Sequence, residues 1–433
     1  MSIRRESSTV LACYQGPEGV DTLMKIPFVD LHAQYLSIKP QIDAAIAEVI
    51  GQSAFIRGPQ VDSFERVWSA TLGLKHCVSC ANGTDALYIA IRALGLKPGD
   101  EVITSAHSWI STSETITQAG GKVVFCDTDN ETFTIDPALI ERKINPATKG
   151  IIPVHLYGQP ADMDAIMAIA RKHNLWVIED CAQAHLARYK GKFVGTFGNA
   201  ATFSFYPGKN LGAYGDAGCI VTNDDRLAQW MATFARHGGK GDHVIEGMNS
   251  RLDGLQAAIL NVKLPHLPRW TDARRKIAAH YDELLTGLGD IITPKVGPER
   301  DHVYHLYVVR TEKRDALRKY LTDAGVATLL NYSKALPFYP AYAYLGHQPA
   351  DFPVAHTNQS RILSLPIYPE MTDEMIGSVG CAIKDAFDHF AASSSGERRP
   401  ELRINNAGPS AECAAARSSQ CTSHRSAPSV AKQ

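Results

Sequence analysis

The chain of 433 residues is long enough for a large hydrophobic core and for two or three domains. Its 44 Lys and Arg residues nearly balance 45 Asp and Glu residues, so the sequence does not favour a broad basic surface for nucleic acid. Apolar residues make up 45% of the chain but occur in short blocks, none of which approaches the roughly 20 residues that span a bilayer. We therefore expect a globular enzyme that binds neither nucleic acid nor a membrane.

The two ends of the chain differ in composition from its body. Residues 1–25 contain no apolar run of signal-peptide length, so we expect a flexible extension and no export. The body is expected to begin near Ile26, and Met1 and Met24 are both candidate start residues. Residues 391–433 are rich in Ala, Ser, Arg and Pro, with hardly any bulky apolar side chain to offset the entropy of ordering. We expect a disordered tail there.

Nine cysteines are scattered along the chain, which fits a reducing cytoplasm better than a disulfide framework. Cys77 and Cys80 have the spacing of a CxxC motif, but no second pair accompanies them and the run continues as an apolar strand. We interpret both as ordinary thiols, and we predict no metal site and a cytoplasmic location.

From residue 77 onward, short apolar runs of β type alternate with amphipathic segments of helical spacing. The runs are Cys77–Ala81, Glu101–Ala106, Lys122–Asp127, Gly150–Tyr157, Leu175–Asp180, Ala201–Tyr206 and Gly218–Thr222. The helical segments between them include Asp85–Leu94, Asp136–Lys143 and Asp162–His173. This alternation predicts an α/β fold in which helices cover both faces of a mostly parallel sheet, and we assign residues 26–252 to that large domain.

The pattern changes after Leu252. A long helical stretch is predicted as far as Leu285, followed by a strand over His302–Arg310 and a helix over Arg314–Ala324. We therefore expect a smaller C-terminal α+β domain over residues 253–390.

Lys209 lies in a loop bent by glycine and proline, directly after an apolar strand. The simple alternative is a solvated surface charge. An amine that forms a Schiff base needs partial desolvation to lower its pKa and a fixed loop to aim it at an aldehyde. A loop that leaves the end of a strand supplies both, which makes Lys209 a candidate catalytic residue.

Asp180 ends another predicted strand, at the place where α/β sheets make their ligand contacts. Capping of a helix is the alternative role. If the ligand is pyridoxal phosphate, a carboxylate here keeps the pyridine nitrogen protonated, which makes the ring an electron sink. Gln183, three residues later, is then placed to reach the ring hydroxyl.

The segment from Asn82 to Asp85 joins a strand to a helix, so free backbone amides and the positive end of the helix dipole would face an anion such as phosphate. Capping by Thr84 or Asp85 is compatible with that role. Trp109 follows the next strand and is expected at the same edge of the sheet. Its ring is suited either to the core or to stacking on an aromatic cofactor.

Four motifs together resemble the DegT/DnrJ/EryC1/StrS sugar aminotransferases: Asn82–Leu87, Glu179–Ala184, Phe203–Asp216 and Asn249–Ala258. The resemblance covers about residues 26–390. It implies aminotransferase fold type I, with pyridoxal 5'-phosphate as cofactor and pyridoxamine 5'-phosphate as its intermediate form. The implied substrates are glutamate and a nucleotide-linked keto-sugar.

The resemblance also implies roles for individual residues. Lys209 matches the Schiff-base lysine, and Asn249 matches an asparagine that reaches the phosphate in the neighbouring subunit, which implies a homodimer with shared active sites. The predicted cofactor-binding set is Gly83, Thr84, Asp85, Trp109, Asp180, Gln183, Ser204, Lys209 and Asn249.

The sugar pocket departs from the family pattern. Many members have His-Tyr-Pro where this chain has Asn331-Tyr332-Ser333, so Asn331 and Tyr332 are the candidate substrate contacts. The presence of Lys209 argues against the dehydratase branch of the family, in which the lysine is replaced. Three short segments are most similar to the branch that aminates C3: Val29–Tyr35, Ala335–Phe338 and Ile362–Pro366.

We therefore expect a dTDP-3-keto-6-deoxyhexose as the substrate. A 4-keto-sugar aminotransferase, a UDP-sugar 3-aminotransferase and a non-enzymatic regulator with the same fold are the alternatives.

Overall fold

The computed structural model describes residues 24–239 and 241–394. Contacts group the chain as far as Phe387 into one compact unit, and a second unit begins at Asp388. The domain boundary that we expect near residue 252 therefore stays a prediction. Nearly all of the predicted N-terminal extension and C-terminal tail lies outside the described residues.

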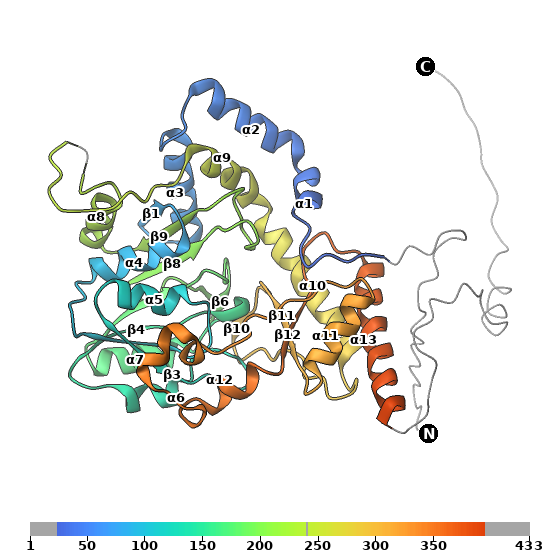
Figure 1. Cartoon of the computed structure of the whole chain (residues 1–433). Helices are drawn as coiled ribbons and strands as arrows, with labels where there is room; N and C mark the ends of the chain where they lie inside the picture. Colours follow the sequence, from blue (N-terminus) through green and yellow to red (C-terminus); the bar gives the residue numbers. More distant parts are fainter. Residues whose placement is uncertain (1–23, 240, 395–433) are drawn as a thin grey trace, which may run out of the picture. The chain divides into compact units, whose positions relative to one another are not determined.

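A seven-stranded sheet forms the centre of the first unit (Figure 1), in the order β1-β9-β8-β5-β4-β2-β3. Strand β9 is antiparallel to both of its neighbours, and the other pairs are parallel, which confirms a mostly parallel sheet. The strands are β1 (His76–Cys80), β2 (Glu101–Ser105), β3 (Lys122–Cys126), β4 (Thr148–Ile152), β5 (Trp176–Asp180), β8 (Ala200–Ser204) and β9 (Gly218–Thr222).

The helices of the described residues begin at capping side chains or prolines in several cases; Asp162, for example, accepts the N–H of Ala165 at the start of α7. None of them combines the length and apolar character that crossing a membrane requires. The α-helices are α1 (Leu31–Ser37), α2 (Lys39–Gln52), α3 (Pro59–Leu72), α4 (Gly83–Ala93), α5 (Ser111–Gln118), α6 (Pro137–Ile140), α7 (Met163–Lys172), α8 (Asp225–Phe234), α9 (Gly254–Lys263), α10 (Leu267–Leu285), α11 (Arg314–Asp323), α12 (Pro353–Asn358) and α13 (Asp373–Ser394).

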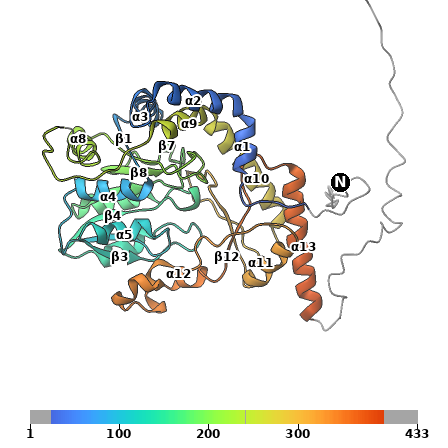
Figure 2. The ribbon, with the colours of Figure 1, turned by 45° about the horizontal axis from the view of Figure 1, so that its top comes forward.

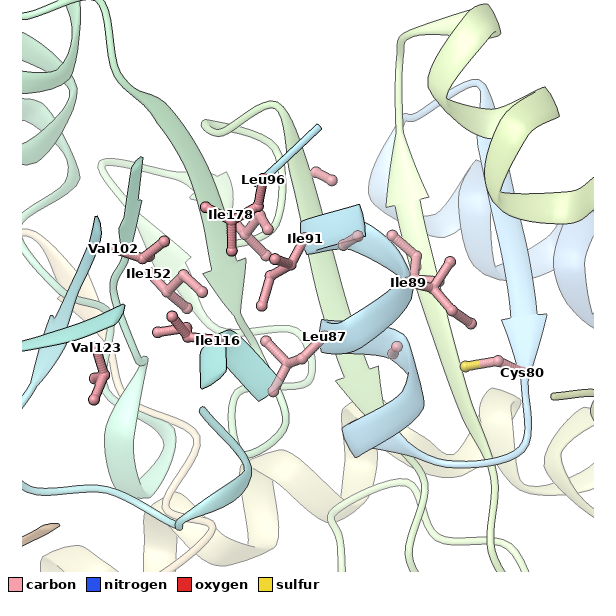
Figure 3. Close-up of a cluster of buried hydrophobic side chains, with 14 of the residues drawn as sticks. Cys80, Leu87, Ile89, Ile91, Leu96, Val102, Ile116, Val123, Ile152 and Ile178 are labelled. Carbon is pink, nitrogen blue, oxygen red and sulfur yellow. The ribbon is translucent and has the colours of Figure 1, made fainter. Parts of the chain in front are cut away.

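Helices cover both faces of the sheet because successive strand residues point to opposite sides. Val102 and Ile152 pack with the helices α4, α5 and α8, whereas their neighbours Ile103 and Ile151 pack with α6 and α7. Figure 3 shows apolar side chains of α4, such as Ile91, lying between that helix and the strands. The predicted double cover of the sheet is confirmed.

Several predicted elements are shorter than expected. The run from Gly150 stops as a strand at Ile152, because Pro153 has no N–H for a sheet ladder. The stretch expected as one helix to Leu285 is α9, a 3-10 turn and α10, since Pro265 and Pro268 interrupt the hydrogen bonds.

The strand expected from residue 302 begins only at Tyr307, after Tyr304 takes a left-handed φ of 45°. The resulting β11 (Tyr307–Arg310) pairs with β12 (Ile362–Leu365) in a separate two-stranded sheet.

The last helix continues through Ser394, past the point where we expect the disordered tail to begin. Extending an existing helix through small residues such as Ala391 costs far less than starting a new one.

Helices α2 and α3 pack against α9, as the view in Figure 2 shows for α2 and α9. The side chain of Trp68, on α3, is completely buried. Its ring lies edge-on to those of Phe203 and Phe205, with centroid distances of 5.1 and 5.8 Å. This aromatic cluster supports the end of β8, from which the Lys209 loop departs.

We expect Trp68→Ala to lower the free energy of unfolding by about 3–5 kcal/mol, because it leaves a large cavity in this cluster. Trp109→Ala is the matched control, since the Trp109 side chain is 56% exposed and its loss should cost about 0.5 kcal/mol or less. Denaturant unfolding of both variants measures the difference. If both variants lost the same free energy of unfolding, Trp68 would not have the packing role that we assign to it.

Candidate active site

Predicted site residues follow four strands whose carboxyl ends meet at one edge of the sheet. Strands β1, β2, β5 and β8 run in the same direction, because β9 is antiparallel to both β1 and β8. Gly83 follows β1, Trp109 follows β2, Asp180 ends β5 and Ser204 ends β8. The topology thus brings together residues that are up to 121 positions apart in the sequence, at the edge where α/β sheets bind ligands.

The start of α4 lies directly against the end of β8. A Cβ atom on Gly83 would lie 2.6 Å from Ser204 Cβ, so only glycine permits this approach. The Thr84 hydroxyl oxygen is 2.7 Å from that of Ser111 on α5. The first N–H groups of a helix have no intrahelical partners, so the structure places three hydroxyl groups beside a helix N-terminus suited to phosphate.

Asn82 caps α4 by accepting the N–H of Asp85 at 2.8 Å, which corrects the expectation that Thr84 or Asp85 is the cap. The Asp85 carboxylate instead accepts the hydroxyl of Ser250 at 2.6 Å, and that hydroxyl accepts the N–H of Ala81 at 3.0 Å. Asp85 therefore ties the segment around residue 250 to α4. Its direct contact with a cofactor stays a prediction.

Asp180 is buried and hydrogen-bonded on both carboxylate oxygens. Thr112 Oγ1 donates to one oxygen at 2.8 Å, and the N–H of Ala182 donates to the other at 3.1 Å. Burial raises the pKa of Asp180, while these two bonds and the charge of Lys209 oppose the rise. Thr112 is not among the predicted site residues, and its position three residues after Trp109 is the only signal for it in the sequence.

Gln183 is held in one orientation by its neighbours. Its Oε1 accepts the N–H of Tyr157 at 2.7 Å, and its Nε2 donates to the Tyr332 hydroxyl at 2.8 Å. The structure thus brings Tyr332 to the site. The Asn331 side chain accepts a hydrogen bond from Ser364 at 2.8 Å, so its predicted contact with a sugar would have to compete with this bond.

The aromatic side chains of Trp109 and Tyr332 lie next to each other at the site, and Tyr332 also contacts His107. The exposed Trp109 ring lies 5.5 Å from the Tyr332 ring, centroid to centroid. His107 Nε2 accepts the N–H of Tyr332 at 3.2 Å, and burial lowers the pKa of His107 to about 4, which keeps this imidazole neutral. Trp109 therefore offers a ring face at the same edge as Asp180, as stacking on a cofactor requires.

Lys209 is half-buried in the loop between β8 and β9, where its N–H donates to the carbonyl of Tyr206 at 2.8 Å. Burial lowers the pKa of its amine from 10.5 to about 8, and the charge of Asp180 acts in the opposite direction. With that pKa, roughly one amine in ten is neutral at pH 7, against fewer than about one in a thousand for an ordinary lysine. This lowering agrees with the partial desolvation that we expect of a Schiff-base lysine, and the catalytic role of Lys209 stays a prediction.

Asn249 is exposed and pairs through its backbone with Arg236. It immediately precedes Ser250, whose hydroxyl reaches Asp85. Its contact with a phosphate across a subunit interface stays a prediction.

Two groups of potential metal ligands lie among the described residues, and the absence of a metal site stays a prediction. Cys77 is half-buried and Cys80 buried, and both are free, as expected. Among the described residues, His155, Glu179 and Cys181 lie close enough to hold an ion. However, the Glu179 carboxylate is already engaged by His155 and by backbone N–H groups of Gly195, Phe197 and Gly198.

We expect the reactivity of Lys209 in the cofactor-free protein to rise with pH and to level off above about 8, because only the neutral amine reacts. Asp180→Asn removes the negative charge that raises this pKa, so the rise should move to lower pH. Amine labelling across pH, quantified by mass spectrometry, measures both curves, with the exposed Lys334 as internal control. A shift to higher pH in Asp180→Asn would contradict the arrangement.

The model of the DegT/DnrJ/EryC1/StrS aminotransferase family matches residues 36–384. A pleiotropic regulatory protein of Geobacillus stearothermophilus is 48% identical, over 85% of this chain and 100% of the relative. The dTDP-3-amino-3,4,6-trideoxy-alpha-D-glucose transaminase of Streptomyces venezuelae is 42% identical, over 80% of this chain and 92% of the relative.

Among solved structures, S. venezuelae DesV in complex with a ketimine intermediate superimposes with a TM-score of 0.82. It is 40% identical, and the match covers 84% of this chain and 99% of DesV. A solved structure of NtdA from Bacillus subtilis, which is 33% identical, contains the pyridoxamine phosphate form of the cofactor. Fold type I, aminotransferase activity and a pyridoxal phosphate cofactor, all expected from the four motifs, are confirmed. The chain belongs to the DegT/DnrJ/EryC1/StrS aminotransferase family.

Proposed function

We propose that this aminotransferase moves the amino group of glutamate to a nucleotide-linked keto-sugar, with a dTDP-3-keto-6-deoxyhexose as the preferred acceptor. The observation that carries the reaction is the placement of the desolvated Lys209 amine and the buried Asp180 carboxylate at one sheet edge, where the charge of each acts on the pKa of the other. A lysine of ordinary pKa would be almost fully protonated near neutral pH and could not act as a base.

The residues at this edge fit pyridoxal phosphate. The α4 N-terminus, with the hydroxyls of Thr84 and Ser204, would hold the phosphate, and the absence of a side chain on Gly83 leaves room for the two segments to meet. Asp180 would bind the pyridine nitrogen, and Trp109 would cover the ring. When bound, the cofactor supplies an electron sink for the carbon that exchanges the amino group.

Lys209 has two tasks in this proposal. Its neutral amine is the attachment point for the cofactor, and it then accepts a proton at Nζ and returns it. Hydrogen bonds from Thr112 and from the N–H of Ala182 favour the charged form of Asp180 near that amine and oppose the rise in its pKa that burial causes. The lowered pKa of Lys209 lets one group take and give the proton near neutral pH.

Tyr332 is the best-placed contact for the sugar or for the ring hydroxyl. Its hydroxyl oxygen accepts from Gln183, so its own hydrogen remains available to donate. Similarity to a transaminase that forms a dTDP-3-amino sugar supports C3 amination. The 4-keto-sugar and UDP-sugar alternatives differ only in the acceptor and are separated by the assay below.

A regulator with the same fold is the second candidate, which the name of the Geobacillus relative favours. Loss of Lys209 or Asp180 would mark such a branch, and this chain retains both. We further propose a cytoplasmic homodimer, in which the exposed Asn249 reaches the phosphate of the neighbouring site.

The pyridoxamine phosphate form of the enzyme, mixed with each keto-sugar, tests the substrate. We expect the dTDP-3-keto sugar to restore the absorption of the aldehyde form fastest, with 4-keto and UDP-linked sugars slower. Borohydride should fix the cofactor covalently to Lys209, and Lys209→Ala should lose both this fixation and turnover, since loss of the base alone costs roughly 100- to 10,000-fold. Fixation at another lysine, or near-normal turnover by the variant, would exclude the site.

Mixed dimers test the shared site. An Asn249→Ala chain paired with a Lys209→Ala chain has one site with both defects and one with neither, if Asn249 acts across the interface. Such heterodimers should retain about half of the wild-type activity, whereas each homodimer is impaired. Activity as low as that of the homodimers would mean that Asn249 acts on its own subunit or not at all.

A further inference from the structure

Lys263, the last residue of α9, is completely buried. Its ammonium donates to the carbonyl of Gly212 at 2.8 Å and lies 4.4 Å from the centroid of the Tyr214 ring. Lysine is rarely buried unless its charge is satisfied, and here the hydrogen bond goes to a backbone carbonyl. The position of the Gly212 carbonyl in the fold gives a reason for burying a lysine here.

Gly212 closes the loop that carries Lys209. A Cβ atom on Gly212 would lie 2.2 Å from the carbonyl oxygen of Pro207, so the chain folds tightly back on itself across Lys209. The N–H of Ala213 then donates to the carbonyl of Phe205 at 2.8 Å, which closes the loop at its base. The Gly212 carbonyl faces away from the loop, toward α9, where Lys263 satisfies it.

Helix α9 binds this segment at a second point. Gln256 Oε1 accepts the N–H of Tyr214 at 2.8 Å, and Gln256 and Lys263 are seven residues apart, on one face of the helix. Two side chains of one rigid helix therefore hold residues three and five positions after Lys209. Neither Gln256 nor Lys263 belongs to the predicted cofactor-binding set.

We propose that Lys263 is a positioning residue that holds the Lys209 loop against α9, so that the Lys209 amine keeps the orientation needed to attach the cofactor. This inference rests on the proposed role of Lys209. It differs from a purely structural role in one respect: Lys263 should influence cofactor binding through the amine of Lys209, since small misplacements of a reacting group cost up to about 100-fold.

The test measures the dissociation constant of pyridoxal phosphate for four forms of the protein: wild type, Lys263→Met, Lys209→Ala and Lys263→Met/Lys209→Ala. Methionine keeps a linear, buried side chain and removes the donor. We expect Lys263→Met to weaken binding at least about tenfold when Lys209 is present and to have little effect in the Lys209→Ala background. Leu321→Ala in α11, also fully buried, is the control for general loss of stability and should leave binding unchanged.

Lys263→Gln, which keeps a shorter N–H donor, should give a smaller effect with the same dependence on Lys209, and it replaces the methionine variant if that variant does not fold. Equal weakening in both backgrounds, or no weakening in either, would overturn the positioning role. If Lys209→Ala alone leaves pyridoxal phosphate binding and borohydride fixation unchanged, the proposed function fails instead, so the two failures are distinguishable.

Discussion

The chemistry of this protein depends on one constraint: a lysine amine must lose enough water to release its proton near neutral pH, yet stay close to a charged carboxylate. Burial of Lys209 lowers its pKa to about 8, and Asp180 limits that fall. Burial also raises the pKa of Asp180, and hydrogen bonds from Thr112 and Ala182 oppose this rise. The Lys209 amine is thus close to a change of charge near neutral pH, as a group that takes and gives a proton requires.

The scaffold around this pair is rigid where the chemistry needs it. Gly83 and Gly212 allow backbone approaches that any side chain would block, and they stand at the two segments that would meet the cofactor. Helix α9 braces the Lys209 loop through Gln256 and Lys263. Side chains on strand ends and on a braced loop are held more precisely than side chains on a free loop.

The same geometry separates an enzyme from a binding protein with the same fold. A regulator could use the phosphate-binding edge near Thr84 and Ser204 without any amine. Burying a lysine and a carboxylate lowers stability, because removing charge from water is costly, so we expect a chain to retain both where they serve a reaction. The pair Lys209 and Asp180 therefore favours catalysis over regulation.

The sequence by itself determined the class of fold and indicated the candidate site residues, since short apolar runs that alternate with helical patterns and strand-end motifs such as Asn82–Asp85 are local signals. It also placed Lys209 on a loop that leaves a strand. It did not reveal the interruption of the long helix after Lys263, because the helical spacing of apolar residues masked the effect of two prolines.

Only the tertiary structure decided which residues support the site. Thr112 and Lys263 act on Asp180 and Gly212, partners 68 and 51 positions away, and no local pattern encodes such contacts. The structure likewise assigned the cap of α4 to Asn82 and the Asp85 carboxylate to Ser250, since several polar residues in a row satisfy the same local rule and distant neighbours select among them.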